Sequence, residues 1–358
     1  MKKITFVSQF PPPIHGLSKA VDTLYHSQLK KIFRFEAIDI TSNKSILKTL
    51  WKLLISRTDV FYFTISQTKM GLWRDLVLME LMEWKNKPLI IHLHGGYLRK
   101  LIDNDCNALQ RKLAYKVIGN ANSCIVLGNS LKYIFEGIVS DERIKLVPNC
   151  ADDEYVMPNV TEKLHVLSSS NCIHILYLSN FIVTKGYREV LDVAKQLKDR
   201  GDGDKFMFHF AGMFFDEKEK MYFESYIENN KLQCVVNYHG IVSGDAKVAL
   251  LQQCNIFMLL TRYPNEGQPI SILEAMGNGM AIVTTNHAGI PDIVQLESGL
   301  VCSKENISIE MITTFLLKCY EDRKILIKMC MYNHKVALQC YTQQQYIDNM
   351  KSIFISAI

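Results

Sequence analysis

Short apolar runs with few polar breaks recur along the chain, at its start, before His94, and at 172–178, 254–260 and 280–285. Buried strands of parallel sheets have this pattern. Helical segments separate the runs in both halves, and such alternation predicts parallel sheets covered by helices on both faces. A chain of 358 residues is long enough for two domains of this kind. We therefore expect an α/β protein with two domains.

The most informative segment, 265–294, follows the apolar run at 254–260. Pro264 and Gly267 prevent the preceding strand from continuing. Pro269 suits the first turn of a helix, which we expect to end at the glycines 277 and 279. The amino end of this helix would face the carboxyl edge of a parallel sheet, where ligands bind and where free backbone N–H groups attract phosphate. Gly267 would let a ligand approach the backbone closely.

Two carboxylates in this segment, Glu266 and Glu274, are separated by seven residues. An ionised carboxylate accepts two hydrogen bonds from a vicinal diol, which both sugars and ribose offer. We expect Glu266 to hold the transferred sugar and Glu274 to hold the ribose. Taken alone, however, this spacing is far more typical of a solvated pair of charges on a helix.

The whole block, with its glycines and flanking strands, resembles the signature of retaining glycosyltransferases of family 4, in particular enzymes that build bacterial surface polysaccharides. The resemblance covers nearly the whole chain. It implies the GT-B fold, an α/β fold of two Rossmann-like domains whose parallel sheets face an inter-domain cleft. We expect an acceptor-binding domain at 1–163, joined by a C-terminal helix at 342–358, and a nucleotide-sugar-binding domain at 164–341, with the boundary in the polar stretch 157–171.

The resemblance also implies functional residues. Glu266, His94 and Lys185 would be catalytic. The donor would be bound by Gly16, Asn180, Lys185, Gly212, Arg262, Glu266, Gly267, Gln268, Pro269, Ile270 and Glu274. A weaker set for the acceptor comprises His15, Arg74, Gly95 and Arg99.

Two departures from the family pattern bear on the leaving diphosphate. Family members commonly have two adjacent glycines in the first loop, where this chain has His15 and Gly16. They also have Gly-Arg where this chain has Ser179 and Asn180, so one expected cation is missing. Charge stabilisation would then depend on Lys185, on helix amino ends, and on Arg188 or Arg262.

The charge is uneven along the chain. Residues 1–165 contain 23 Lys and Arg against 16 Asp and Glu, a net charge of +7, whereas the remainder carries −2. A basic first half is expected if that half meets an anionic membrane surface or a diphosphate-linked acceptor. No nucleic-acid-binding motif accompanies the charge, so we expect no nucleic acid partner. The helix predicted at 71–87 has an apolar face that either lies at a bilayer interface or, the reading we favour, packs in the core.

Cysteine usage and hydropathy indicate the compartment. Ten cysteines lack zinc-binding spacing, and disulfides are not expected in a chain of this size with buried strands. No apolar stretch reaches the length of a spanning helix, and no signal-peptide pattern is present at the start. We expect a cytoplasmic protein, with peripheral contact to the inner face of the cytoplasmic membrane as an extension of this reading.

The activity implied by the resemblance is transfer of a sugar, with retained anomeric configuration, from a nucleotide-sugar donor to a glycan or lipid-linked acceptor. A UDP-sugar is favoured over a GDP-sugar because it is common among relatives. We expect no cofactor and no metal, since the Asp-x-Asp strings at 103–105 and 202–204 follow no buried strand. The alternatives are a nucleotide-sugar epimerase of the same fold and a nucleotide-sugar-binding partner protein without catalysis. A dinucleotide dehydrogenase is disfavoured because no Gly-x-Gly-x-x-Gly follows the first strand.

Overall fold

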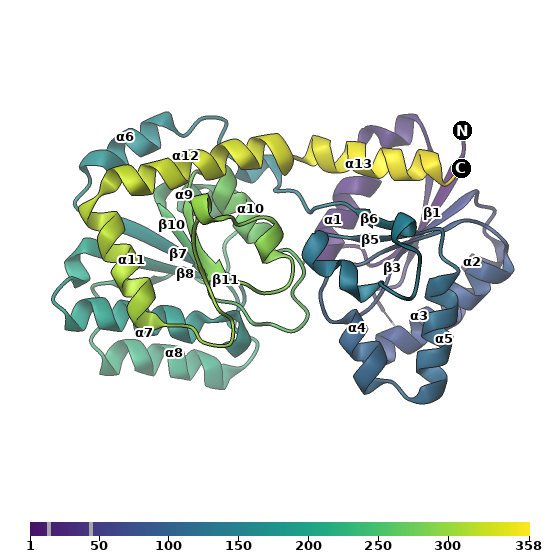
Figure 1. The fold of residues 1–358 in the computed structure, drawn as a ribbon, viewed down its shortest axis with the longest axis horizontal. Helices are drawn as coiled ribbons and strands as arrows, with labels where there is room; N and C mark the ends of the chain where they lie inside the picture. Colours follow the sequence, from purple (N-terminus) through teal and green to yellow (C-terminus); the bar gives the residue numbers. More distant parts are fainter. Residues whose placement is uncertain (13–15, 43–45) are drawn as a thin grey trace. The chain divides into compact units, whose positions relative to one another are not determined.

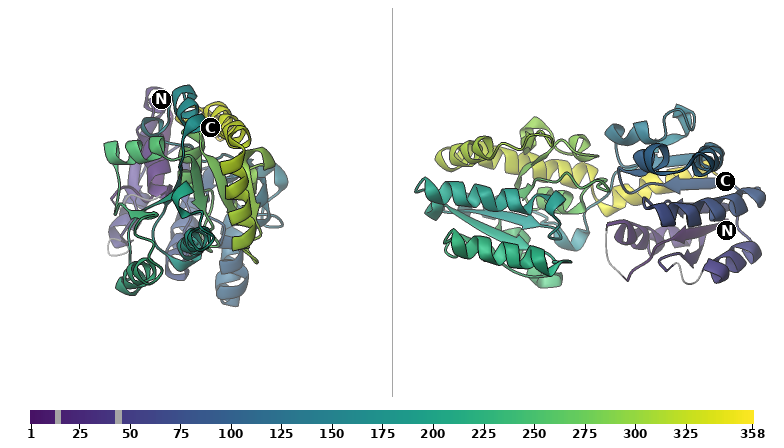
Figure 2. Two further views of the ribbon diagram at one scale, coloured as in Figure 1. Left: turned by 90° about the vertical axis from the view of Figure 1, so that its left-hand side faces the viewer. Right: turned by 90° about the horizontal axis from the view of Figure 1, so that it is seen from below.

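The computed structural model describes residues 1–12, 16–42 and 46–358 and divides into two compact units. The first unit comprises Met1–Cys150, Asn265–Gln268 and Gln343–Ile358, and the second comprises Ala151–Pro264 and Pro269–Thr342. Each unit has its own parallel sheet with helices on both faces (Figures 1 and 2). The expected α/β class with two parallel-sheet domains is confirmed.

The sheet of the first unit has the strand order β2-β1-β3-β4-β5-β6, and all its pairings are parallel. Its strands are β1 Lys3–Ser8, β2 Arg34–Asp39, β3 Val60–Thr64, β4 Leu89–His92, β5 Ser123–Val126 and β6 Ile144–Leu146. The α-helices are α1 Gly16–Tyr25, α2 Ile46–Ile55, α3 Lys69–Trp84, α4 Leu98–Lys100, α5 Ala108–Gly119 and α13 Gln343–Ser356. Helices α1 and α13 pack together in one hydrophobic cluster with β1 and β3, while α3 packs against both α2 and α5.

The sheet of the second unit has the order β12-β11-β10-β7-β8-β9, again all parallel. Its strands are β7 Ile173–Leu178, β8 Phe206–Ala211, β9 Val236–Tyr238, β10 Ile256–Leu259, β11 Ala281–Thr285 and β12 Gly299–Cys302. Its helices are α6 Thr161–Ser169, α7 Tyr187–Asp199, α8 Glu217–Asn229, α9 Gly244–Gln253, α10 Ile270–Gly277, α11 Ile309–Glu321 and α12 Arg323–Cys340. Helix α7 packs against α8 and α11, and α12 packs against α6 and α10 (Figure 1).

The strands form where the sequence is apolar on both faces. Every residue of β3, β4, β5, β10 and β11 is buried. Central strands of a parallel sheet are covered by helices on both sides, which is why these segments lack the alternation of a half-exposed strand. Helix α10 begins directly after Pro269 and ends at Gly277, as expected from the sequence.

The division between the units differs from the expected boundary at 163. The structure assigns Ala151 and the residues after it to the second unit. The polar stretch 157–171, in which we expect the boundary, contains α6, and three of its apolar side chains, Val160, Leu164 and Leu167, are buried in the core of the second unit. Burial of these side chains fixes the segment to that core.

The chemical state of the cysteines and the length of the helices bear on the compartment. All ten cysteines are free thiols. In the described ranges, no helix combines the length and the apolar character that a membrane span requires.

Candidate functional site

The segment Asn265–Gln268 belongs to the first unit, although the sequence places it within the second domain. Hydrogen bonds explain the assignment. The backbone N–H of Asn149 donates to Gln268 Oε1 at 2.7 Å, and its side-chain amide donates to the Gln268 carbonyl at 2.9 Å. Gln268 Nε2 in turn donates to the carbonyl of Leu127 at 3.2 Å. Gln268, which we expected to bind the donor, therefore uses its side chain to hold this segment.

Gly267 is required by packing within the first unit. A Cβ atom at this position would lie 2.4 Å from the carbonyl oxygen of His94, closer than real side chains approach. At Gly95 a Cβ would lie 2.7 Å from the carbonyl of Asn265. Two glycines thus let the segment that carries Glu266 lie directly against the end of β4. Glu266 itself is nearly buried, with 7% of its surface exposed.

Two histidines at the end of β4 lie on the same side of the sheet, as their spacing predicts. The rings of His92 and His94 have centroids 3.9 Å apart. His92 is fully buried, and its Nδ1 lies 2.8 Å from the hydroxyl of Tyr62. Burial and the neighbouring His94 lower the pKa of His92 well below its usual value, so this ring stays neutral. His94 is only partly buried and lies next to the segment with Glu266.

In the second unit, Glu274 pairs with a lysine that sequence reasoning did not identify. Lys247 of α9 places its Nζ 2.7 Å from Glu274 Oε1, and the two side chains are 17% and 5% exposed. The ammonium also lies 3.9 Å from the ring centroid of Tyr155. The only sequence signal was a lysine on an otherwise apolar helix segment, which is also typical of a solvated position. The two side chains thus form an ion pair that is largely shielded from solvent.

The cations considered as substitutes for the missing arginine are already engaged. Arg262 contacts Glu189 at 2.6 Å, and Arg188 contacts Glu219 at 2.7 Å. Lys185, at the end of a short 3₁₀ turn Val183–Lys185, lies 4.8 Å from the ring centroid of Tyr263. The backbone N–H of Arg262 donates to the carbonyl of Thr184 at 2.7 Å. The two loops that carry Lys185 and Arg262 are therefore held together.

The glycine predicted after β8 is required by close packing and by its backbone conformation. Gly212 has φ +149°, and a Cβ there would lie 1.9 Å from the carbonyl of Ser179. Asn180, next to Ser179, is exposed, and its carbonyl accepts a hydrogen bond from Tyr177 at 2.9 Å. The loops after β7 and β8 thus lie against one another. Ile270 is the first residue of α10, with Pro269 as its N-cap.

The residues predicted to bind the acceptor are largely held by internal pairs. Arg74 is 9% exposed in its side chain and lies 2.7 Å from the buried carboxylate of Asp75. Burial raises the pKa of Asp75 to about 6, and the Arg74 charge opposes this rise. Arg99 contacts Asp103 at 2.6 Å and donates to the carbonyl of Glu136.

Gly16, which we expected to bind the donor, is the exposed first residue of α1. His15 lies outside the described residues.

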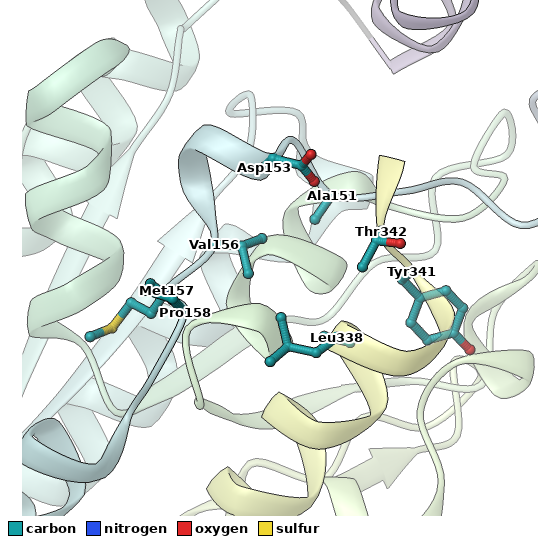
Figure 3. Close-up of a pocket in the computed structure, with 9 residues that line it drawn as sticks. Ala151, Asp153, Val156, Met157, Pro158, Leu338, Tyr341 and Thr342 are labelled. Carbon is teal, nitrogen blue, oxygen red and sulfur yellow. The ribbon is translucent and has the colours of Figure 1, made fainter. Parts of the chain in front are cut away.

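A pocket of about 200 Å³ lies in the second unit (Figure 3). It is lined by Ala151, Asp153, Val156, Met157, Pro158, Ala337, Leu338, Tyr341 and Thr342. None of the residues predicted to bind donor or acceptor lines it. The backbone N–H of Ala151 donates to the carbonyl of Tyr341 at 3.0 Å, so the pocket walls are joined by main-chain pairing.

The two Asp-x-Asp strings serve local structure. Asp103 accepts from Arg99 and Tyr115, and Asp105 accepts from Tyr97. Asp202 pairs with Lys205 at 2.6 Å. Within the described part of the chain, no group of three or more His, Cys, Asp or Glu side chains is arranged to hold a metal ion.

Comparison with known sequences finds similarity to glycosyltransferases, chiefly in the second half of the chain. Residues 166–335 match the family model described as glycosyl transferases group 1. A putative colanic acid biosynthesis glycosyltransferase of Escherichia coli is 27% identical over 129 residues, which are 35% of this chain and 30% of that protein. An uncharacterized glycosyltransferase of Methanocaldococcus jannaschii is 22% identical over 82% of this chain and 76% of that protein. The match to the Escherichia coli relative thus spans less than a third of its length.

Solved structures share the fold over the full length. HepE of Anabaena, in complex with UDP and glucose, has a TM-score of 0.73 and 15% identity, with 99% of this chain and 100% of that chain covered. Sucrose-phosphate synthase from Thermosynechococcus elongatus has a TM-score of 0.76 and 12% identity, with 99% of each chain covered. The chain has the GT-B fold of these structural neighbours, and residues 166–335 match the model of glycosyl transferases group 1.

Proposed function

We propose that the chain is a retaining, family 4 glycosyltransferase that moves a sugar from a UDP-sugar to a hydroxyl of a glycan acceptor on a lipid diphosphate. The UDP donor is supported by the solved HepE structures, which hold UDP or UDP-glucose. A role in surface polysaccharide biosynthesis is supported by the relatives named for colanic acid. The retaining outcome rests on the resemblance of the 265–294 block.

One observation carries the proposal: Gly267 lies against the His94 carbonyl, which fixes the segment of Glu266 next to that histidine. A carboxylate and an imidazole held side by side can bind sugar hydroxyls and stabilise positive charge on the sugar as the bond to the diphosphate breaks. Glu266 is assigned to donor positioning and charge stabilisation. His94 is assigned to the reacting sugar and the acceptor hydroxyl.

The departing diphosphate requires positive charge. Lys185 and the N–H groups at the start of α10 supply it in this proposal, because oriented N–H groups and cations stabilise an anion without a metal. Glu274, whose partner Lys247 fixes its orientation, would accept hydrogen bonds from the ribose hydroxyls.

The test is incubation of the purified protein with labelled nucleotide sugars and a lipid-linked glycan acceptor. Transfer of label with retained anomeric configuration, seen by NMR of the product, is the expected result. Interconversion of the donor sugars without an acceptor would identify an epimerase instead, and transfer with inversion would refute the retaining assignment.

A second candidate, a nucleotide-sugar-binding protein without catalysis, is favoured by one specific observation. Asn180 stands where the family has arginine, and both Arg188 and Arg262 are ion-paired with glutamates. Donor binding by calorimetry without any turnover, over a panel of acceptors, would support this candidate.

A further inference from the structure

The apolar arc of helix α2 is wider than the side of the helix that faces the protein. The inward side buries Thr49 and Leu53 as the helix packs against β2 and α3 (Figure 1). The outward side consists of four side chains, here called the α2 patch. These are Leu47 at 80% exposed, Trp51 at 61%, Leu54 at 47% and Ile55 at 56%.

The spacing of the α2 patch makes it one continuous surface. Residues 47, 51, 54 and 55 recur at intervals of four, three and one, so they share about a third of the helix circumference. A stripe of this kind normally faces the core, because exposed apolar area costs free energy. Its exposure in the first unit indicates a surface that a partner covers.

The charges beside the α2 patch indicate the chemistry of that partner. Lys48 and Lys52 are exposed on the adjoining arc of the helix, and α2 contains no acidic residue. At the carboxyl end of the helix, Lys85 donates to the carbonyl of Leu54 at 2.7 Å. Trp84, beside Lys85 in the chain, is 75% exposed and adds a second amphipathic ring to this end. Lysines flanking an apolar stripe with tryptophan are the composition of a helix that lies in a membrane interface.

We propose that α2 docks on the surface of a bilayer containing anionic lipids, with the α2 patch inserted among the acyl chains and Lys48 and Lys52 at the headgroups. A second copy of the chain fits less well. A twofold contact through this patch would bring the lysines of one copy near those of the other, and like charges oppose such an interface. The net charge of +7 on residues 1–165 adds attraction to anionic lipids.

The proposal places the membrane contact on α2, whereas the sequence suggested the helix predicted at 71–87 as a candidate. In the helix predicted at 71–87, Leu76 of the apolar face is fully buried, whereas Val77 and Trp84 are 47% and 75% exposed, so α3 packs in the core with only part of that face. The proposal does not depend on glycosyl transfer, because no residue of α2 belongs to the predicted donor or acceptor set.

Vesicle flotation tests the proposal. The full-length protein should float with vesicles of phosphatidylcholine and phosphatidylglycerol in equal parts, and less with phosphatidylcholine alone. The double variant Leu47→Gln/Trp51→Gln should reduce the bound fraction about tenfold or more, since two inserted apolar side chains are lost. Lys48→Gln/Lys52→Gln should remove the preference for phosphatidylglycerol. The matched control Leu296→Gln alters a side chain that is 89% exposed in the second unit and should bind as the parent does.

Fluorescence identifies the inserted residue. The chain has three tryptophans, so Trp73→Phe/Trp84→Phe leaves Trp51 as the sole tryptophan. Its emission should shift to the blue on vesicle addition and be quenched by brominated acyl chains. Circular dichroism and UDP-induced thermal stabilisation, unchanged in every variant, would show that the fold and donor binding are intact.

Three outcomes would overturn the proposal. The first is equal flotation of the parent protein and Leu47→Gln/Trp51→Gln. The second is an unchanged Trp51 spectrum on vesicles that bind the protein. The third is absence of vesicle binding together with a concentration-dependent dimer that Leu47→Gln/Trp51→Gln abolishes, which would assign the patch to a second copy.

Discussion

Glu266 is a nearly buried carboxylate whose neighbour Gly267 lies against the backbone of His94. In the proposed reaction this carboxylate contacts the sugar as charge develops on it. Glu266→Ala should lower kcat by several hundredfold, because loss of one preorganised contact typically costs about 10²–10³ in rate. The measurement is kcat with a labelled donor, and thermal melting should show a folded protein. A folded variant that retains near-parental kcat would remove Glu266 from the reaction.

The Lys247–Glu274 pair allows a stability test that does not need the substrate. Removal of one partner leaves a buried charge without compensation, which typically costs about 3–5 kcal/mol. Lys247→Met should therefore lower the free energy of unfolding in urea, and Lys247→Met/Glu274→Gln should recover most of the loss. The exposed pair Lys195–Asp199 serves as a matched control, since a surface pair contributes about 0–1 kcal/mol. Equal effects of Lys247→Met and Lys195→Met would contradict the account.

The sequence predicted where strands and helices begin and end better than it predicted which partners each side chain contacts. The roles of Gly267 in ending the strand and of Pro269 in starting the helix were predicted from local preferences, because glycine and proline favour turns and helix starts. The role of Gln268 in holding Asn149, more than a hundred positions away, depends on tertiary contact and has no local signal. The same holds for Lys247, whose partner lies on another helix.

At the scale of elements, a ladder of three histidines crosses the sheet of the second unit. His174 of β7 bonds His209 of β8 at 2.9 Å, and His209 bonds His239, just after β9, at 2.9 Å. The rings are stacked with centroids 5.2 and 5.1 Å apart. Burial lowers the pKa of all three, and burial together with the neighbouring His174 and His239 lowers the pKa of His209 to about 4. The ladder is stable when its rings are neutral.

The ladder predicts how stability depends on pH. Unfolded histidines bind protons near a pKa of about 6.5, and the folded ladder resists protonation to lower pH. Its contribution is therefore present above about 6.5 and lost as the pH falls from there toward 4. The melting temperature should drop by at least a few degrees between about pH 7.5 and about pH 5, and His209→Gln should show a smaller drop. Replacement of the exposed His165 is the control. A pH response unchanged by His209→Gln would contradict this prediction.

The apolar runs of the sequence predicted the strands β1, β4, β7, β10 and β11, but the pattern did not indicate which side of a helix is covered. The stripe of α2 has the spacing of a core-facing helix, yet Leu47 and Trp51 are exposed. Conversely, the polar composition around α6 suggested a domain boundary, although Leu164 and Leu167 are buried. In both segments the outcome depends on the neighbouring elements, which a local pattern does not specify.

At the scale of the whole molecule, we predict that the proposed transferase needs no divalent metal. Lys185 and backbone N–H groups neutralise the diphosphate in this account, so activity should be unchanged in excess EDTA. Lys185→Ala should weaken donor binding, measured by calorimetry with UDP, whereas the exposed Lys195→Ala should not. Strict dependence on manganese, or unchanged UDP affinity in Lys185→Ala, would contradict this part of the account.

The assignment of residues to units was only partly accessible from sequence. The chain predicts two α/β halves because strands and helices alternate in both. It does not predict that four residues, Asn265–Gln268, leave the second half to pack in the first. The segment packs there because Gly95 and Gly267 allow close backbone contact and Gln268 bonds Asn149, and these partners lie far apart in the sequence.

The central claim is that the 265–274 segment binds the nucleotide sugar, and the most direct measurement is a crystal structure of the protein with UDP. The account predicts the ribose hydroxyls within hydrogen-bond distance of the Glu274 carboxylate and the diphosphate near Lys185. UDP bound elsewhere, with Glu266 and Glu274 contacting only protein and solvent, would contradict it.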